Sequence, residues 1–179
     1  MNNRVTPYLF KDAFIAAFQM NKQSLIWTDD RVLKTSVMQS YIYHAIAKSL
    51  NMYLICELEH LDATFFYEEV VQHCIKTGIG YPEPKYIQVA LEHEINATSS
   101  HNEMTKLVKL NCPLNVLITY REYDQYSWLT KKFSSNLSTL NGDAGEFLVI
   151  LPRQEPSVEL SQRWNYFVWD KQQNSFTAM

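Results

Sequence analysis

Glycine is scarce in this chain, and its cysteines are few. The 179 residues include four glycines and three cysteines, and 46% of the residues are hydrophobic. So little glycine excludes a fibrous repeat, and so much apolar content excludes a disordered tail. The cysteines are odd in number and contain no CxxC pair, which argues against a disulfide framework and a zinc ribbon. We therefore expect a reducing compartment. The cysteines are Cys56, Cys74 and Cys112.

Long apolar runs are also missing. No segment approaches the roughly 20 consecutive apolar residues that a membrane-spanning helix needs. Residues 1–18 mix Arg4, Lys11 and Asp12 with apolar residues, unlike a signal peptide. We therefore expect a cytoplasmic protein without a membrane partner. Its formal charge of −3 and pI near 5.9 give no global attraction to nucleic acid, although a local basic patch can coexist with an acidic total.

Several catalytic and cofactor motifs are absent. The chain has no nucleophile elbow, phosphate loop or dinucleotide fingerprint, because the lone GIG at residues 78–80 lacks a third glycine and a following helix. His60, His73 and His101 lack the i, i+4 spacing of a zinc-binding helix and are expected at the surface. These absences disfavour nucleotide-cofactor enzymes and helical zinc sites.

The patterns that are present predict one α/β domain over residues 1–179, with a central mixed β-sheet flanked by helices. Helical periodicity and capping signals predict helices at residues 8–20, 31–50, 67–76, 99–110 and 127–140. Runs rich in β-branched and aromatic residues predict strands at residues 52–66, 86–94, 116–120 and 147–151, and a hairpin of residues 164–169 and 175–177. Residues 52–66 fit either one long strand or two short ones.

Two carboxylates share one face of a predicted strand. Side chains alternate along a strand, so residues 87–94 place Glu92 and Glu94 on one face, about 7 Å apart. His93 lies on the other, apolar face, where we expect a hydrogen-bonded core histidine. Two nearby carboxylates repel one another in a poorly solvated site unless a proton or cation lies between them, and Mg²⁺ or Mn²⁺ prefers such oxygen ligands. The alternative is a solvated polar strand face.

Asp62 supplies a third acid in an otherwise apolar segment. A carboxylate there is costly to bury and requires a partner. If its strand pairs with the following one as an antiparallel hairpin, Asp62 lies across from Glu92 on the same face. Alternatively, Asp62 caps a turn after His60 or pairs with Lys34 or Lys48.

This order of elements resembles the PD-(D/E)xK nuclease superfamily, whose core has a helix, a strand carrying Asp, a strand carrying Glu-x-Lys, a helix and a further strand. The resemblance covers about residues 31–120 and implies a restriction-endonuclease-like core. It implies that Asp62 is the metal-binding aspartate and that Glu92 is the first acid of the motif. Glu94 occupies the place of the usual lysine, as in some members. The helix at residues 31–50 lacks the glutamate of many members, and Gln39 and His44 are its polar candidates.

The resemblance implies metal-dependent hydrolysis of phosphodiester bonds in nucleic acid, with DNA as the expected partner. Asp62 and Glu92 would bind one or two Mg²⁺ or Mn²⁺ ions, and Glu94 would act as a ligand or general base. Lysines that could contact the phosphate backbone are Lys106, Lys109, Lys131 and Lys132.

A second function also fits the sequence. Glu94 at the lysine position, the missing helix glutamate and the acidic net charge favour a catalytically inactive nuclease-fold protein that binds a protein or nucleic-acid partner. The two functions differ in whether Asp62 and Glu92 bind a metal ion.

Overall fold

The fold is taken from a computed structural model that describes residues 4–22, 35–96, 99–110, 112–120, 127–129, 133–134, 137, 145–153 and 159–179. The helices are α1 (Pro7–Asn21), α3 (Tyr43–Ser49), α4 (Glu68–Thr77) and α5 (Ser100–Leu110), with a π-helical turn at Met38–Ile42 and 3₁₀ turns at Leu58–His60, Pro84–Tyr86 and Leu160–Gln162. The strands are β1 (Met52–Cys56), β2 (Ala63–Tyr67), β3 (Val89–Glu94), β4 (Leu114–Thr119), β5 (Glu146–Pro152), β6 (Trp164–Asp170) and β7 (Ser175–Ala178).

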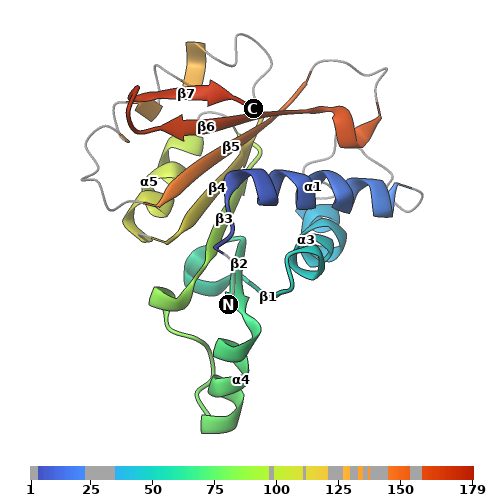
Figure 1. The fold of residues 1–179 in the computed structure, drawn as a ribbon, viewed down its shortest axis with the longest axis vertical. Helices are drawn as coiled ribbons and strands as arrows, with labels where there is room; N and C mark the ends of the chain where they lie inside the picture. Colours follow the sequence, from blue (N-terminus) through green and yellow to red (C-terminus); the bar gives the residue numbers. More distant parts are fainter. Residues whose placement is uncertain are drawn as a thin grey trace.

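The strands form one seven-stranded mixed sheet in the order β1-β2-β3-β4-β5-β6-β7 (Figure 1). The three central strands β3, β4 and β5 are parallel to one another, and the remaining neighbours pair antiparallel. The predicted α/β class with a central mixed sheet is therefore confirmed. Helix α5 connects β3 to β4, which is the crossover that a parallel pair requires.

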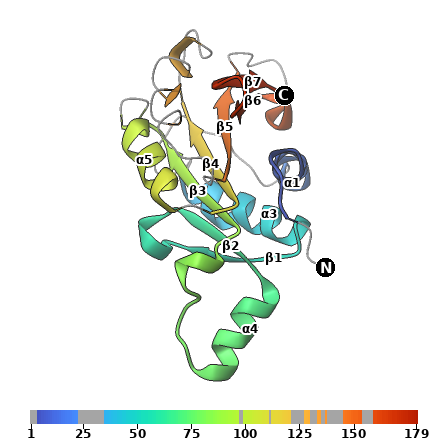
Figure 2. The same ribbon diagram turned by 60° about the vertical axis from the view of Figure 1, so that its left-hand side comes forward.

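Helices cover both faces of the sheet (Figure 2). Helices α1 and α3 pack on one face, where α1 contributes Phe10, Phe14 and Phe18 at i, i+4 spacing to the core. Phe14 meets Trp164 of β6 edge to face, with ring centroids 5.3 Å apart. Helix α5 packs on the opposite face, where its residues Met104 and Leu107 lie in a second core cluster. The central strands are therefore buried on both faces, as their continuous apolar sequences predict.

Most predicted elements are present, with local differences. Residues 52–66 form two short strands, the second of the two alternatives. The predicted helix at residues 31–50 contains the π-helical turn ahead of α3, and its first four residues lie outside the described part of the chain, as does its expected cap. Within residues 127–140, the described positions are helical.

Strand β3 starts later than its sequence predicts. The ladder begins at Val89, and Val89 and Leu91 face the core shared with α1 and α3. Ile87 belongs to the core cluster on the opposite face, so the prediction that it shares a face with Val89 is wrong. The reason is that Ile87 lies outside the strand, directly after the 3₁₀ turn at Pro84–Tyr86, where side chains do not alternate.

Helix α4 and the segment after it extend beyond one end of the sheet (Figures 1 and 2). The helix follows β2 directly, and Gly78 ends it with a φ of 72° in the left-handed region, which glycine adopts without strain. Among the residues that the structure describes, no helix has both the length and the apolar character to cross a membrane.

Candidate functional site

The pairing of β2 with β3 brings Asp62 and Glu92 together. Ala63 lies opposite Leu91 in this antiparallel ladder, so one further step places Asp62 opposite Glu92. The backbone N–H of His93 donates a hydrogen bond of 2.7 Å to Asp62 Oδ2. The main chain of β3 therefore fixes the Asp62 carboxylate beside Glu92, which is the arrangement that the hairpin hypothesis predicts.

The acid pair is removed from water. Glu92 is 3% exposed, so the alternative of a solvated strand face is wrong for this residue, whereas Asp62 is half-buried. Burial raises the pKa of Glu92 to about 8, and the neighbouring Asp62 carboxylate contributes to the rise while Lys106 opposes it. Burial also raises the pKa of Asp62, although hydrogen bonds from the His93 amide and the Glu92 carboxyl counteract the rise. The pair therefore favours sharing one proton near neutral pH.

Lys106 of α5 brings a positive charge to the pair. Its Nζ lies 2.7 Å from Glu92 Oε1 and forms a second ion pair with Glu103, one turn earlier on the same helix. The same ammonium donates a hydrogen bond of 3.1 Å to the His60 carbonyl. Helix α5 thus contributes both a cation and a further carboxylate to the site.

The loop between β1 and β2 carries unusual backbone strain. Glu57, Glu59 and His60 have φ values of 58°, 55° and 63°, in the left-handed region that non-glycine residues rarely adopt. Each such residue costs about 1 kcal/mol or more. Gln39 Nε2 bonds Glu57 Oε1 at 2.9 Å, and Lys106 bonds His60, so side chains hold the loop near both ends. This loop leads directly into Asp62, and strain of this kind tends to occur at functional sites.

Tyr43 lies at the same end of the sheet. Its side chain is fully buried, and its hydroxyl has no hydrogen-bond partner among the described residues. Burial raises the pKa of Tyr43, and the charges of nearby groups raise it further; in decreasing order these are Asp62, Tyr120, Cys56 and Glu92. The Tyr43 hydroxyl is therefore a buried polar group whose pKa responds to the charges of Asp62 and Glu92.

Glu94 lies apart from the acid pair. It is half-buried, and its Oε1 accepts a hydrogen bond of 2.6 Å from the backbone N–H of Asn96. Its partner in the parallel ladder is Thr119 of β4, a buried residue whose hydroxyl has no hydrogen-bond partner in the described structure. Asp62 and Glu92 are thus brought together, whereas Glu94 is committed to a local turn.

His93 is a hydrogen-bonded core histidine, as expected. It is 8% exposed, and its Nε2 lies 2.9 Å from the Tyr120 hydroxyl. The two rings are tilted at 49° with centroids 5.5 Å apart, and Tyr120 in turn meets Trp164. The side chain of His93 therefore packs on the α1 and α3 face, away from Lys106.

Other sequence candidates fall outside this cluster. Gln39 contacts Glu57 of the strained loop, and His44 is exposed on α3. Lys109 is exposed on α5, and Lys48 is exposed on α3. The candidates outside the described residues are Lys34, Lys131 and Lys132.

The sequence interpretation missed two parts of the cluster. Glu103 lies three residues before Lys106 on α5, and this i, i+3 spacing is a signal that the two side chains face the same way. Tyr43 carries no such signal, because only the packing of α3 against the sheet buries its hydroxyl where the charge of Asp62 reaches it.

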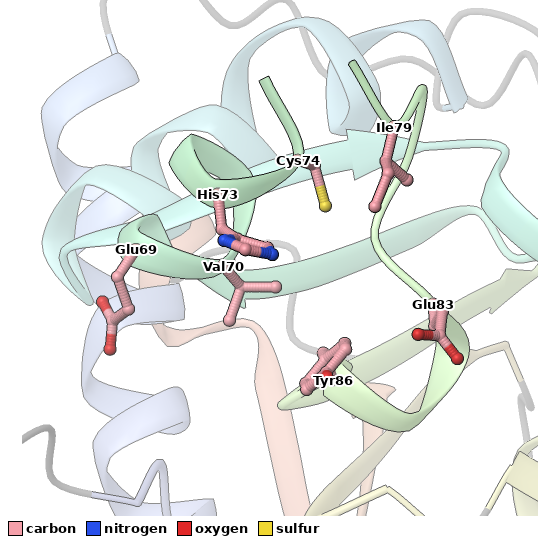
Figure 3. Close-up of a pocket in the computed structure, with 7 residues that line it drawn as sticks. All are labelled: Glu69, Val70, His73, Cys74, Ile79, Glu83 and Tyr86. Carbon is pink, nitrogen blue, oxygen red and sulfur yellow. The ribbon is translucent and has the colours of Figure 1, made fainter. Parts of the chain in front are cut away.

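A separate pocket of about 290 Å³ lies between α4 and the segment that follows it (Figure 3). Its lining residues are Glu69, Val70, His73, Cys74, Ile79, Glu83 and Tyr86. Since β2 runs from Asp62 at one end to α4 at the other, the pocket and the acid pair lie at opposite ends of this strand. His73 is exposed on α4, as predicted, and Cys74 is buried.

Comparisons of the chain with known protein families, with curated proteins and with solved structures found no match.

Proposed function

We propose that this chain is a metal-dependent nuclease-like protein of the PD-(D/E)xK type that hydrolyses phosphodiester bonds in DNA. The observation that carries the proposal is the β2–β3 register, which sets Asp62 opposite the buried Glu92 with Lys106 beside them. The order of elements supports it as well. Strands β1, β2 and β3 pair antiparallel in order, with α4 between β2 and β3, and helix α5 then leads to strand β4, which is parallel to β3; this order is compatible with a restriction-endonuclease-like core.

The side chains at the acid pair suit a hard divalent ion. Asp62 and Glu92 offer carboxylate oxygens, the ligands that Mg²⁺ and Mn²⁺ prefer. No group of three or more His, Cys, Asp or Glu side chains within the described ranges is arranged to hold a metal ion. Mg²⁺ is commonly held by one or two carboxylates together with waters and substrate phosphate oxygens. The proposal therefore assigns two protein ligands and leaves the remaining positions to the substrate and water.

In the proposed hydrolysis, the metal ion and the side chains of the site have different roles. A bound divalent ion would lower the pKa of a water molecule and stabilise the charge on the phosphate. The His93 amide holds Asp62 in place through main-chain geometry, so the aspartate is oriented before any ligand arrives. Lys106 balances the negative charge of Glu92 in the ligand-free protein.

Glu94 is proposed as the general base, in keeping with its place two residues after Glu92 on β3. To take a proton from water, its carboxylate would have to release the backbone N–H of Asn96. Glu94 is half-buried at the end of the strand.

One observation favours a second function, a catalytically inactive nuclease-fold protein that binds a protein or nucleic-acid partner. The Glu94 carboxylate is engaged at Asn96 and the Lys106 ammonium at three oxygens, so both side chains are satisfied without substrate. Under this function, the acid pair and Lys106 form a structural network and not a catalytic one.

A cleavage assay separates the two functions. Supercoiled plasmid, single-stranded DNA and RNA would be incubated with Mg²⁺ or Mn²⁺ and with wild type, Asp62→Asn, Glu92→Gln or Glu83→Gln. Glu83 is a matched control, because it is an exposed acid at the rim of the separate pocket. We expect wild type and Glu83→Gln to cleave plasmid DNA, and the two site variants to lose about 100-fold or more of this activity.

The opposite results are equally informative. Equal cleavage by all four proteins would point to a contaminating nuclease and refute the assignment of Asp62 and Glu92. Absence of cleavage by folded wild type, with DNA or protein binding that both site variants retain, would favour the inactive binding protein.

A further inference from the structure

The Lys106 ammonium is surrounded by oxygens from three separate elements. Glu92 Oε1 of β3 lies 2.7 Å away, Glu103 of α5 forms an ion pair with it, and the His60 carbonyl of the β1–β2 loop accepts a hydrogen bond of 3.1 Å. An ammonium group has three N–H donors and no acceptor. Three donors facing three oxygens leave the group with no N–H to spare for a further ligand.

This arrangement resembles a small cation site already filled by a side chain. The surrounding atoms are two carboxylate oxygens and a main-chain carbonyl, which are the oxygen types that bind hard divalent ions. A divalent ion on Glu92 would lie within a few ångströms of Nζ, where like charges repel strongly in a poorly solvated environment. The ammonium and the ion therefore compete for the same buried carboxylate.

Lys106 is able to leave. Its side chain is 41% exposed, whereas that of Glu92 is 4% exposed. The flexible lysine stem can carry the ammonium into water without unpacking α5, whose core contacts are made by Met104 and Leu107. The buried Glu92 side chain cannot move into water in the same way. The Glu92 carboxylate therefore stays in place, and the divalent ion replaces the ammonium as its partner.

A second observation points to a further ligand at this place. The Tyr43 hydroxyl is fully buried and has no hydrogen-bond partner within the part of the chain that the structure describes, and the charge of Asp62 reaches it. Buried hydroxyls are nearly always hydrogen-bonded in folded proteins. A water molecule or a hydrated ion would supply the partner that the described residues do not.

We propose that Lys106 is an internal counter-ion that fills the cation site of Glu92 and withdraws when a divalent ion binds. This proposal rests on the metal-dependent function proposed above. Lys106 and the metal ion are then mutually exclusive partners of Glu92, and removing the lysine charge strengthens metal binding instead of weakening it.

Calorimetric titration with Mg²⁺ tests the competition. Wild type, Lys106→Met and Lys109→Met would be compared at pH 8.5, where protons compete least with the ion for Glu92. Lys109→Met removes an equal charge from an exposed position on the same helix and controls for the change in net charge. We expect Lys106→Met to bind Mg²⁺ about tenfold more tightly than the other two proteins, since a like charge in direct contact with the ligand is removed.

Each outcome separates this inference from the proposed function. Equal or weaker binding by Lys106→Met overturns the competition, while binding by wild type leaves the metal-dependent function standing. Binding by Lys106→Met alone supports the competition and contradicts a native metal site. Absence of binding in every folded protein refutes both proposals.

Chemical labelling of wild type gives a second measurement, which does not depend on a variant that folds. Lysines would be acylated briefly with and without Mg²⁺, and modification at each lysine would be quantified by mass spectrometry with Lys109 as the internal reference. We expect Mg²⁺ to raise Lys106 labelling severalfold relative to Lys109, because the released ammonium leaves its three oxygen partners and becomes accessible to the reagent. An unchanged ratio would contradict the withdrawal of Lys106.

Discussion

Replacing Glu92 by glutamine should abolish a loss of stability that the wild type undergoes on going from pH 6 to pH 9. In the folded protein, the pKa of Glu92 is raised to about 8 from an ordinary value of 4.5. Between these values the folded state holds a proton that the unfolded state releases, so the free energy of unfolding falls as the pH rises. Below both values, and above both, this group makes no pH-dependent contribution.

The size of the effect follows from the pH interval. Stability changes by about 1.36 kcal/mol for each pH unit over which the two states differ by one proton. From pH 6 this gives about 2.3 kcal/mol by pH 8, where Glu92 is half titrated, and about 2.7 kcal/mol by pH 9. Because water reaches the half-buried Asp62 next to Glu92, some of this is screened, and we expect about 1.5 to 2.7 kcal/mol.

Urea unfolding at pH 6, 7, 8 and 9 measures the difference directly. The wild type should lose stability relative to Glu92→Gln across this range, and the two proteins should be most alike at pH 6, where Glu92 is neutral. Glu94→Gln is the matched control, since it alters a half-buried acid on the same strand and should follow the wild-type curve. Parallel curves for wild type and Glu92→Gln would refute the assignment of a buried, proton-binding carboxyl to this position.

Substitutions at three further positions test the packing of the fold and the hydrogen bonds of the site. Gly145→Ala would place a Cβ 1.8 Å from the Cys112 carbonyl oxygen, so we expect destabilisation of about 3 kcal/mol or more in thermal or urea unfolding; wild-type stability would contradict this close approach. Tyr43→Phe removes a buried hydroxyl without a described partner, and we expect urea unfolding to show unchanged stability or a gain of up to about 1 kcal/mol, whereas a clear loss would reveal a hydrogen bond. Asp62→Ala leaves the His93 N–H without its acceptor and should cost about 1 to 3 kcal/mol at neutral pH, while Asp62→Asn, which keeps an acceptor oxygen, should cost less.

The sequence allows the acid pair to be predicted because local rules determine it. Alternation along β3 sets the face of Glu92, and a hairpin between neighbouring strands sets Asp62 against it. The observed register, with Ala63 opposite Leu91, agrees with the predicted placement of Asp62 across from Glu92.

The rest of the site depends on tertiary packing that the sequence pattern does not encode. The contact of Lys106 with Glu92 requires the rotation of α5 against the sheet, which is set by apolar residues on the opposite side of the helix. The left-handed backbone of Glu57, Glu59 and His60 cannot be predicted from the sequence, because none of these residues is a glycine or an asparagine. Such strain is maintained by surrounding contacts and is therefore visible only in the folded structure.

The start of β3 could not be predicted accurately from the sequence either. Alternation over residues 87–94 predicts that Ile87 shares a face with Val89, but the 3₁₀ turn at Pro84–Tyr86 changes the direction of the side chains before the ladder begins. Strand boundaries determine which residues obey the period of two, and a continuous apolar sequence does not mark them.

The backbone and the side chain of His93 make contacts on different sides of the sheet. Its amide orients Asp62, while its ring bonds Tyr120 on the far side. The amide is present in every residue type except proline, so the position between Glu92 and Glu94 can change its side chain without disturbing the acid pair. Selection can therefore remodel the core beneath α1 and the acids facing α5 separately, with proline as the one substitution that affects both.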